Sequence, residues 1–101
     1  MAEEHPMFLC LNPTPGKHGT RIPKWKYDLI RHAILKVVPK NDEGITFKEL
    51  PSLIEKTLTE LDQHRLGSVS WYTTTVKLDL EVRGEIERIP GMRPQRLRRL
   101  T

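Results

Sequence analysis

The sequence predicts a mainly α protein with a small β-hairpin, an α+β fold in which a three-helix core follows an extended N-terminal arm. Three observations support this fold class. Three segments place apolar residues at helical spacing. The first 23 residues hold four of the eight prolines, which disfavours a helix there. Near the C-terminus, two short segments of alternating polarity flank Pro90 and Gly91, as in a hairpin.

Residues 1–23 are expected to form the arm, and residues 24–101 the folded domain. The stretch "NPTPGKHG" (12–19) is unsuitable for a helix, because proline lacks a donor and glycine is flexible. The apolar stretch "MFLCL" (7–11) suits a short strand, or an arm laid on a neighbouring surface.

The segment "KWKYDLIRHAILKVV" (24–38) predicts the first helix, because its apolar residues recur at spacings of three and four and Pro39 ends it. The turn "NDEG" (41–44) and the β-prone "ITF" (45–47) come next. Thr46 then opens a capping box with Glu49. The second helix is therefore expected from Phe47 to about Thr59, and "DQHRLG" (62–67) is expected to be a connection.

A third helix is predicted over residues 71–83, with Ser68 or Ser70 as its cap and Gly84 at its end. "EIERI" (85–89) and "QRLRRL" (95–100) then alternate as strands around the turn "PGMRP" (90–94). The side chains expected in the core are Ile30, Ile34, Leu50, Leu53, Ile54, Val76, Leu80 and Ile86.

This order of elements resembles the winged helix-turn-helix superfamily over residues 24–100. "LDLEVRGEIER" (78–88) looks like a recognition helix running into the first strand of a wing, with Leu80, Gly84 and Ile86 at the spacing found in many regulators. More narrowly, "LNPTPGK", "KYDLIRHAIL", "GITFKEL" and "SWYTTTVKLDLEVRGEIER" are similar to a family of small, uncharacterised bacterial winged-helix proteins. The resemblance implies that the third helix enters a DNA major groove while the wing touches the backbone or minor groove.

Positive charge gathers at two places in a chain of net charge +4. Residues 24–40 carry five Lys or Arg and one Asp, and residues 88–101 carry five Arg and no acid. Arginine suits phosphate and a narrow minor groove. The alternative is that these arginines pair with Glu85, Glu87 or acids on the second helix. The residues expected to contact nucleic acid are Thr73, Thr74, Lys77, Arg88, Arg93, Arg96, Arg98 and Arg99.

The third helix has two apolar faces. Val69, Tyr72, Val76 and Leu80 lie on one face, and Trp71, Leu78 and Val82 lie opposite, with Thr75 beside them. Since packing on a core needs only one apolar face, the second should meet something else. Asp79 and Glu81 on this helix are expected to oppose the approach of phosphate.

Either the chain's own arm or a second subunit could cover this second face, and a homodimer is the favoured expectation. The residues expected to form a partner interface are Phe8, Leu9, Trp71, Leu78 and Val82.

Nothing in the sequence indicates catalysis, a cofactor or a metal. The four histidines share no metal-ligand spacing with Cys10 or with an acid pair. Cys10 lies among apolar residues, which predicts a buried, inert thiol. One cysteine, no apolar run of membrane length and no secretory signal together favour a cytoplasmic protein.

Two functions are therefore expected from the sequence. The first is a winged-helix regulator that contacts duplex DNA through a basic wing. The second is a winged-helix protein-interaction module, used for dimerisation or as an adaptor, without sequence-specific DNA binding. Fold analogy favours the first, and the doubly apolar third helix favours the second.

Overall fold

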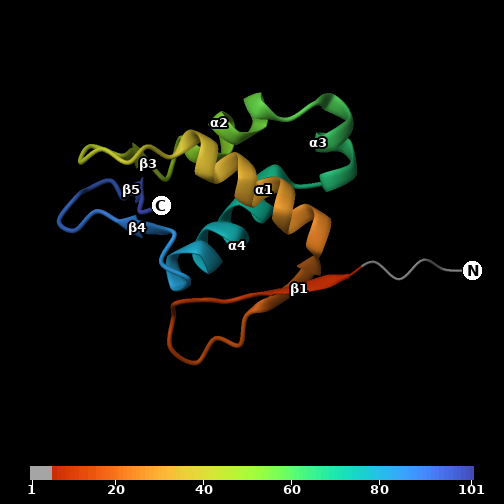
Figure 1. Cartoon of the computed structure of the whole chain (residues 1–101), viewed down its shortest axis with the longest axis horizontal. Helices are drawn as coiled ribbons and strands as arrows, with labels where there is room; N and C mark the ends of the chain where they lie inside the picture. The colour runs from red at the N-terminus through yellow and green to blue at the C-terminus, as the bar shows by residue number, and fades with distance from the viewer. Residues whose placement is uncertain (1–5) are drawn as a thin grey trace, which may run out of the picture.

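The computed structural model describes residues 6–101, and within that range it shows an α+β fold of four helices and two small sheets (Figure 1). The elements in chain order are β1 (Met7–Cys10), β2 (Thr20–Pro23), α1 (Lys24–Val37), β3 (Ile45–Thr46), α2 (Leu50–Thr57), α3 (Glu60–Leu66), α4 (Val69–Val82), β4 (Ile86–Arg88) and β5 (Arg96–Arg99). Over residues 6–101, every helix is too short or too polar to cross a membrane. Residues 1–5, the first part of the predicted arm, lie outside the described residues.

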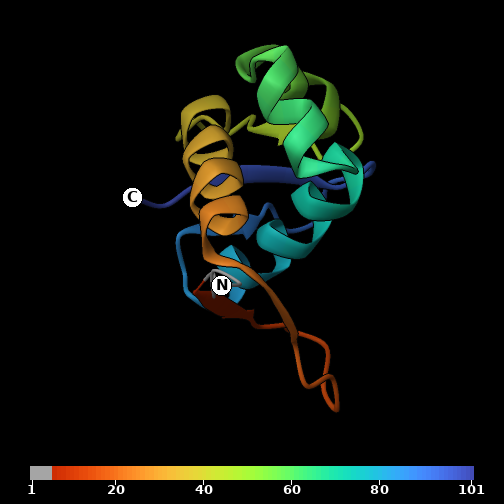
Figure 2. The same ribbon diagram turned by 90° about the vertical axis from the view of Figure 1, so that its right-hand side faces the viewer.

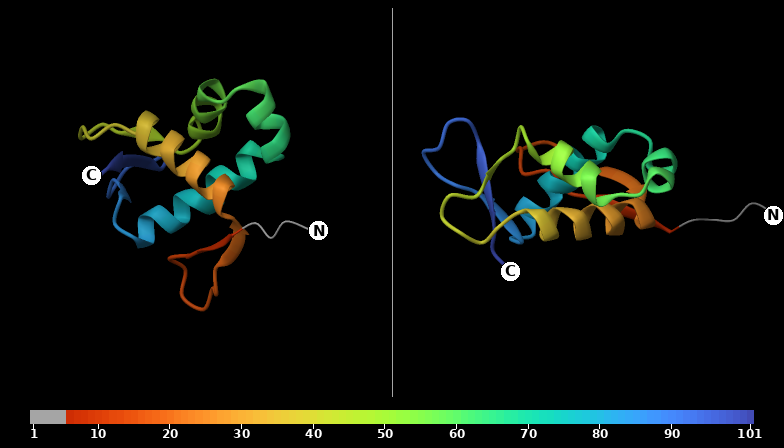
Figure 3. Two further views of the ribbon diagram at one scale, coloured as in Figure 1. Left: turned by 45° about the vertical axis from the view of Figure 1, so that its right-hand side comes forward. Right: turned by 90° about the horizontal axis from the view of Figure 1, so that it is seen from above.

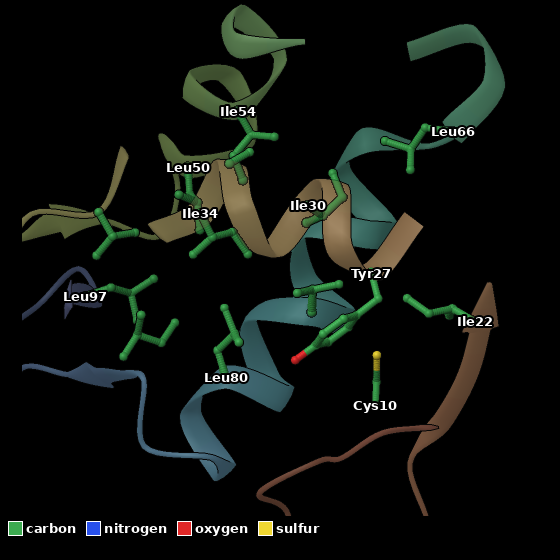
Figure 4. Close-up of a cluster of buried hydrophobic side chains, with 14 residues drawn as sticks. Cys10, Ile22, Tyr27, Ile30, Ile34, Leu50, Ile54, Leu66, Leu80 and Leu97 are labelled. Carbon is green, nitrogen blue, oxygen red and sulfur yellow. The ribbon is translucent and has the colours of Figure 1, made fainter. Parts of the chain in front are cut away.

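Residues 7–23 form an antiparallel hairpin, so the prediction of an extended arm is wrong for this part of the chain. The register pairs Met7 with Pro23 and Cys10 with Thr20. The strand over residues 20–23 gives little sequence signal, because Ile22 is its one fully buried side chain. Cys10 and Ile22 join the hydrophobic core beneath α1 and α4 (Figure 4). The hairpin therefore shares one core with the helices.

α1 begins directly after Pro23, and its buried face carries Tyr27, Ile30, Ala33 and Ile34. The backbone leaves the helix at Val38, whose amide still donates to the carbonyl of Ile34. The predicted helix over residues 24–38 is thus confirmed to within one residue.

The predicted second helix forms as α2, which is shorter at both ends, and α3 follows it as a fourth helix where only three were predicted. The capping box forms, with the Thr46 amide 3.0 Å from Glu49 Oε2 and the Glu49 amide 3.3 Å from Thr46 Oγ1. It closes a turn, and α2 starts one residue later, at Leu50, with Pro51 in the first helical turn.

α3 occupies most of the predicted connection over residues 62–67. Thr59 has extended backbone and caps α3, its hydroxyl accepting from the Asp62 amide at 3.0 Å. The Gln63 amide group donates to the carbonyls of Glu55 and Leu58, which ties α3 to the end of α2. Thr59 followed by Asp62 is the sequence signal that marks this helix start.

α4 starts at Val69, two residues before the predicted position, because Ser68 caps it by accepting from the Trp71 amide at 3.1 Å. The helix ends at Val82, before Gly84 with its positive φ of 77°. β4 and β5 follow α4 and join β3 in a three-stranded antiparallel sheet of order β3-β5-β4. The predicted C-terminal hairpin is thus confirmed, with shorter strands than predicted.

The core lies between α1, α2, α4 and the inner faces of both sheets (Figure 4). Its buried apolar side chains are Cys10, Ile22, Tyr27, Ile30, Ala33, Ile34, Val38, Leu50, Ile54, Leu66, Val76, Leu80, Ile86 and Leu97. The predicted core is therefore confirmed, except that Leu53 is only half-buried. In the register of the sheet, Leu97 pairs with Ile45 and with Arg88, so alternation turns Arg96 and Arg98 to the outer face.

Candidate functional site

The most distinctive surface feature of the molecule is one uncovered side of α4. Val76 and Leu80 anchor the opposite side in the core. At 100° per residue, Trp71, Thr75, Leu78 and Val82 fall within one narrow sector, which we call the α4 strip. Trp71 is 48% exposed and Val82 is 43% exposed, while Thr75 and Leu78 are half-buried. The second apolar face predicted from the sequence therefore exists and is open.

One flank of the α4 strip is held by Asp79, which is completely buried. Its carboxylate accepts from Tyr27 Oη at 2.6 Å, from the Leu11 amide at 2.8 Å and from Arg83 Nε at 2.8 Å. Burial and the bond to Asp79 raise the pKa of Tyr27 far above its usual value. Asp79 is thus fully paired inside the protein and presents no charge to an approaching phosphate, contrary to the prediction.

The N-terminal hairpin docks on this same flank. Phe8 stacks on Tyr27 with ring centroids 3.8 Å apart, and the Arg83 guanidinium lies 4.9 Å from the Phe8 ring. A terminal nitrogen of Arg83 also donates to the carbonyl of Leu9 at 3.3 Å. Phe8, predicted to meet a partner, is instead packed within its own chain, while the Leu9 side chain is exposed.

The other flank of the α4 strip holds a second buried ion pair. Lys77, whose residue surface is 2% exposed, places Nζ 2.8 Å from Glu81 Oε2 and 4.5 Å from the Phe47 ring centroid. Burial lowers the pKa of Lys77. Glu81 Oε1 accepts from Arg88 Nε at 2.6 Å. Lys77 and the fully buried Thr73 therefore offer no surface to a DNA groove, while Thr74 is half-buried beside the α4 strip.

Most of the arginines of the β4–β5 hairpin contact their own chain. Arg98 pairs with Asp42 at 2.9 Å and with Glu87 at 3.4 Å, and Arg96 donates to the Glu43 carbonyl at 3.1 Å. Arg99 donates to the Val38 carbonyl at 3.2 Å, at the end of α1. Arg93 is exposed at the turn.

The acids that hold these arginines differ in part from those the sequence suggested. Glu87 is a partner as expected, but Glu85 pairs with Arg31 of α1. Pairing within the chain thus accounts for Arg88, Arg96, Arg98 and Arg99.

Aromatic and cationic side chains gather at the N-terminal end of the α4 strip. Trp71 meets Tyr72 edge-on with centroids 4.9 Å apart. Lys26 Nζ lies 4.7 Å from the Tyr72 centroid and donates to the Leu66 carbonyl at 3.0 Å. The Arg65 guanidinium lies 5.3 Å from the Trp25 centroid. Lys26 therefore places a positive charge beside the Trp71 end of the α4 strip.

The two hairpins frame α4. The N-terminal hairpin lies beneath α4 in Figure 1 and in the left view of Figure 3, and in Figure 2 its loop and the β4–β5 turn both project to the side on which α4 lies. The β4–β5 turn carries Arg93, and the N-terminal loop carries Lys17 and His18.

Over residues 6–101, no three His, Cys, Asp or Glu side chains lie close enough to hold a metal ion. Cys10 is buried, and burial followed by the charge of Asp79 raises its pKa to about 12, so the thiol stays protonated at neutral pH. His32 is exposed on α1. A surface hollow beside α2 is lined by Ser52, Glu55, Lys56 and Gln63.

Comparison with known proteins places the chain in a family. A model described as a family of unknown function (DUF6958) matches residues 7–97, which is nearly the whole chain, so the chain belongs to this family. No curated protein and no solved structure matches the chain.

Proposed function

We propose that this member of DUF6958 is a winged-helix domain that works as a protein-interaction module, with the α4 strip as its contact surface. The domain supplies a rigid scaffold, and α4 presents uncharged side chains to another protein. No chemical step is assigned to it.

The arrangement of elements supports the winged-helix part of the proposal. After α1, the chain makes β3, two helices, α4 and the β4–β5 hairpin, and β5 lies between β3 and β4. This order matches the one expected from the resemblance apart from one added helix, α3, with α4 in the place of the third helix and β4–β5 in the place of the wing.

One observation carries the functional part: the α4 strip places the exposed Trp71 and Val82 at its two ends with the half-buried Leu78 between them, and its own N-terminal hairpin leaves it open. The hairpin occupies the Asp79 and Arg83 flank instead. Exposed Trp and aliphatic side chains that are contiguous on a soluble protein mark interaction sites. Trp71 suits the role of anchor, because aromatic side chains dominate the binding energy of protein interfaces.

Sequence-independent contact with duplex DNA is the second candidate, and the exposed Arg93 at the β4–β5 turn favours it. Arg98 and Arg99 favour it less, because two guanidinium nitrogens of each already donate to acceptors in the chain. If DNA binds here, Arg93→Gln should reduce the slope of log affinity against log salt by about 0.9 for each phosphate that is no longer neutralised.

Site-specific cross-linking in the native host tests the primary proposal. A photoreactive residue replaces Thr75 in the α4 strip or, as the control, the exposed His32 on α1. We expect a protein cross-link from position 75 that position 32 does not give and that Leu78→Glu removes. Light scattering of the purified chain shows whether that protein is a second copy, as in a homodimer.

A result opposite to the expected cross-linking would contradict the proposal. It consists of no cross-link specific to position 75, together with random-sequence duplex DNA binding measured by fluorescence polarisation at about 50 mM salt and weakening steeply at about 200 mM.

A further inference from the structure

Resting on the proposed function, we infer that the partner of the α4 strip is an acidic amphipathic segment of another protein. Its apolar side chains lie on the strip, and its Asp or Glu side chains meet arginines on either side. Charge complementarity around the strip carries this assignment.

The acids of α4 point inward and the arginines that pair with them point outward. The side chains of Asp79 and Glu81 are 0% and 10% exposed, whereas those of Arg83 and Arg88 are 37% and 50% exposed. A partner therefore meets the positive side of both ion pairs. The outer surface beside α4 is cationic even though the acids of this helix outnumber its single lysine.

These arginines border the α4 strip on opposite sides. Helical spacing sets Asp79 beside Thr75 and Val82, so Arg83 lies along that edge. Glu81 is three residues from Leu78, so Arg88, bound to Glu81, lies along the other edge.

Both guanidinium groups keep donors for a partner. Arg88 uses Nε for Glu81, and its two terminal nitrogens have no acceptor within residues 6–101. Arg83 uses Nε for Asp79 and one terminal nitrogen for the Leu9 carbonyl. Arginine has five N–H donors, and a carboxylate accepts two of them side by side.

The same charge pattern argues against a second copy as the occupant. Lys26 borders the Trp71 end of the α4 strip through Tyr72, and Arg83 and Arg88 border the Val82 end. Pairing two such surfaces in either direction brings cations against cations. A nucleic acid would satisfy the arginines but would lay polar base edges on Trp71, Leu78 and Val82, which leaves those edges without hydrogen-bond partners.

The size of the surface sets the size of the partner. Trp71 and Val82 are eleven positions apart, or about 16 Å along the helix axis. A partner helix of about three turns covers that length. The required pattern is apolar side chains at helical spacing with acids on both flanks.

Selection from a random 16-residue peptide library against the full chain tests this inference. Peptides that also bind Leu78→Glu are removed, so the survivors depend on the α4 strip. We expect the survivors to be enriched in Asp and Glu next to Leu, Phe or Trp. For individual peptides on the parent chain, exchange of each acid for its amide should weaken binding about two- to fivefold, the value of one exposed ion pair.

Matched variants locate the effect on the protein. Arg88→Gln should weaken the acidic peptides about two- to fivefold, whereas Lys36→Gln, the same charge change on the exposed side of α1, should alter affinity less than about 1.5-fold. The unfolding midpoint of each variant checks that it is folded. The acid-to-amide exchange in the peptide needs no protein variant, so the inference stays testable if Arg88→Gln fails to fold.

The other possible results distinguish the claim that the α4 strip binds a protein from the claim that this protein is acidic. Survivors without acid enrichment, or with unchanged affinity on acid-to-amide exchange, overturn the acidic partner and leave the interaction module standing. If the parent chain is a dimer that Leu78→Glu dissociates, the acidic partner is also overturned and the interaction module is kept. No survivor that depends on Leu78, together with no cross-link from position 75, overturns both.

Discussion

At the scale of single residues, Gly44 shows how closely the backbone packs where β3 begins. Its φ is +60°, a value that residues with a side chain rarely adopt, and a Cβ there would overlap the carbonyl oxygen of Leu97. Gly16 has a φ of +84° but has open space around its missing Cβ. The two glycines therefore separate backbone strain from steric overlap.

We predict that Gly44→Ala destabilises the protein more than Gly16→Ala. Gly16→Ala should cost about 1–2 kcal/mol, the cost of a left-handed backbone alone. Gly44→Ala carries that cost and must also displace a strand of the sheet. Denaturant unfolding of both variants measures the difference, and equal destabilisation would mean that Leu97 does not approach Gly44 as described.

The buried thiol of Cys10 makes stability depend on alkaline pH. Its folded pKa, about 12, lies above the unfolded value of 9.0, because burial and Asp79 disfavour the thiolate. A group whose pKa is raised on folding stabilises the protein fully below the unfolded pKa, and that contribution is lost as pH rises. Tyr27 acts in the same direction, and Lys77, whose pKa is lowered, acts in the opposite direction.

The contribution of Cys10 can be isolated by comparison with Cys10→Ala. Between pH 9 and 12, the parent should lose up to about 1.4 kcal/mol per pH unit relative to the variant. Urea unfolding of both proteins at several pH values gives this difference. A difference that does not change with pH would show that Cys10 is not buried in solution.

At the scale of the elements, helix caps explain what the sequence predicted and what it missed. The Ser68 cap was among the two expected, and α1 was predicted closely because its apolar residues recur regularly and Pro39 ends it. α3 was missed because its apolar content is slight, with Leu66 its one fully buried residue. Its beginning is marked by the polar pair Thr59 and Asp62, which the apolar pattern does not report.

Ser68 and Ser70 provide a matched test of the α4 cap. Ser68→Ala removes the acceptor of the Trp71 amide and should cost about 1 kcal/mol, within a range of about 0.5–2 kcal/mol. Ser70 is exposed and its hydroxyl makes no hydrogen bond within the described residues, so Ser70→Ala should change stability by less than about 0.5 kcal/mol. Equal effects in chemical unfolding would place the cap elsewhere.

At the scale of the whole molecule, the candidate site depends on contacts that join distant parts of the chain. The two apolar faces of α4 were predictable from spacing alone. That Asp79 is buried was not, because the Leu11 amide and the Tyr27 hydroxyl that enclose it belong to residues 68 and 52 positions away along the chain, and only its ion pair with Arg83 is local. Lys77 and Glu81 were likewise expected at the surface, since nothing in a local pattern shows that Phe47 and Arg88 enclose them.

A partner can bind the α4 strip only if the strip is open in the free protein. Methyl NMR of a dilute sample with a soluble paramagnetic agent measures this directly, because Val76 and Leu80 on the same helix serve as buried references. We predict strong broadening of the Val82 methyls, intermediate broadening at Thr75 and Leu78, and almost none at Val76 and Leu80, independent of protein concentration. Protection of the Val82, Thr75 and Leu78 methyls equal to that of Leu80 at every dilution would contradict the account, because the strip would then already be covered.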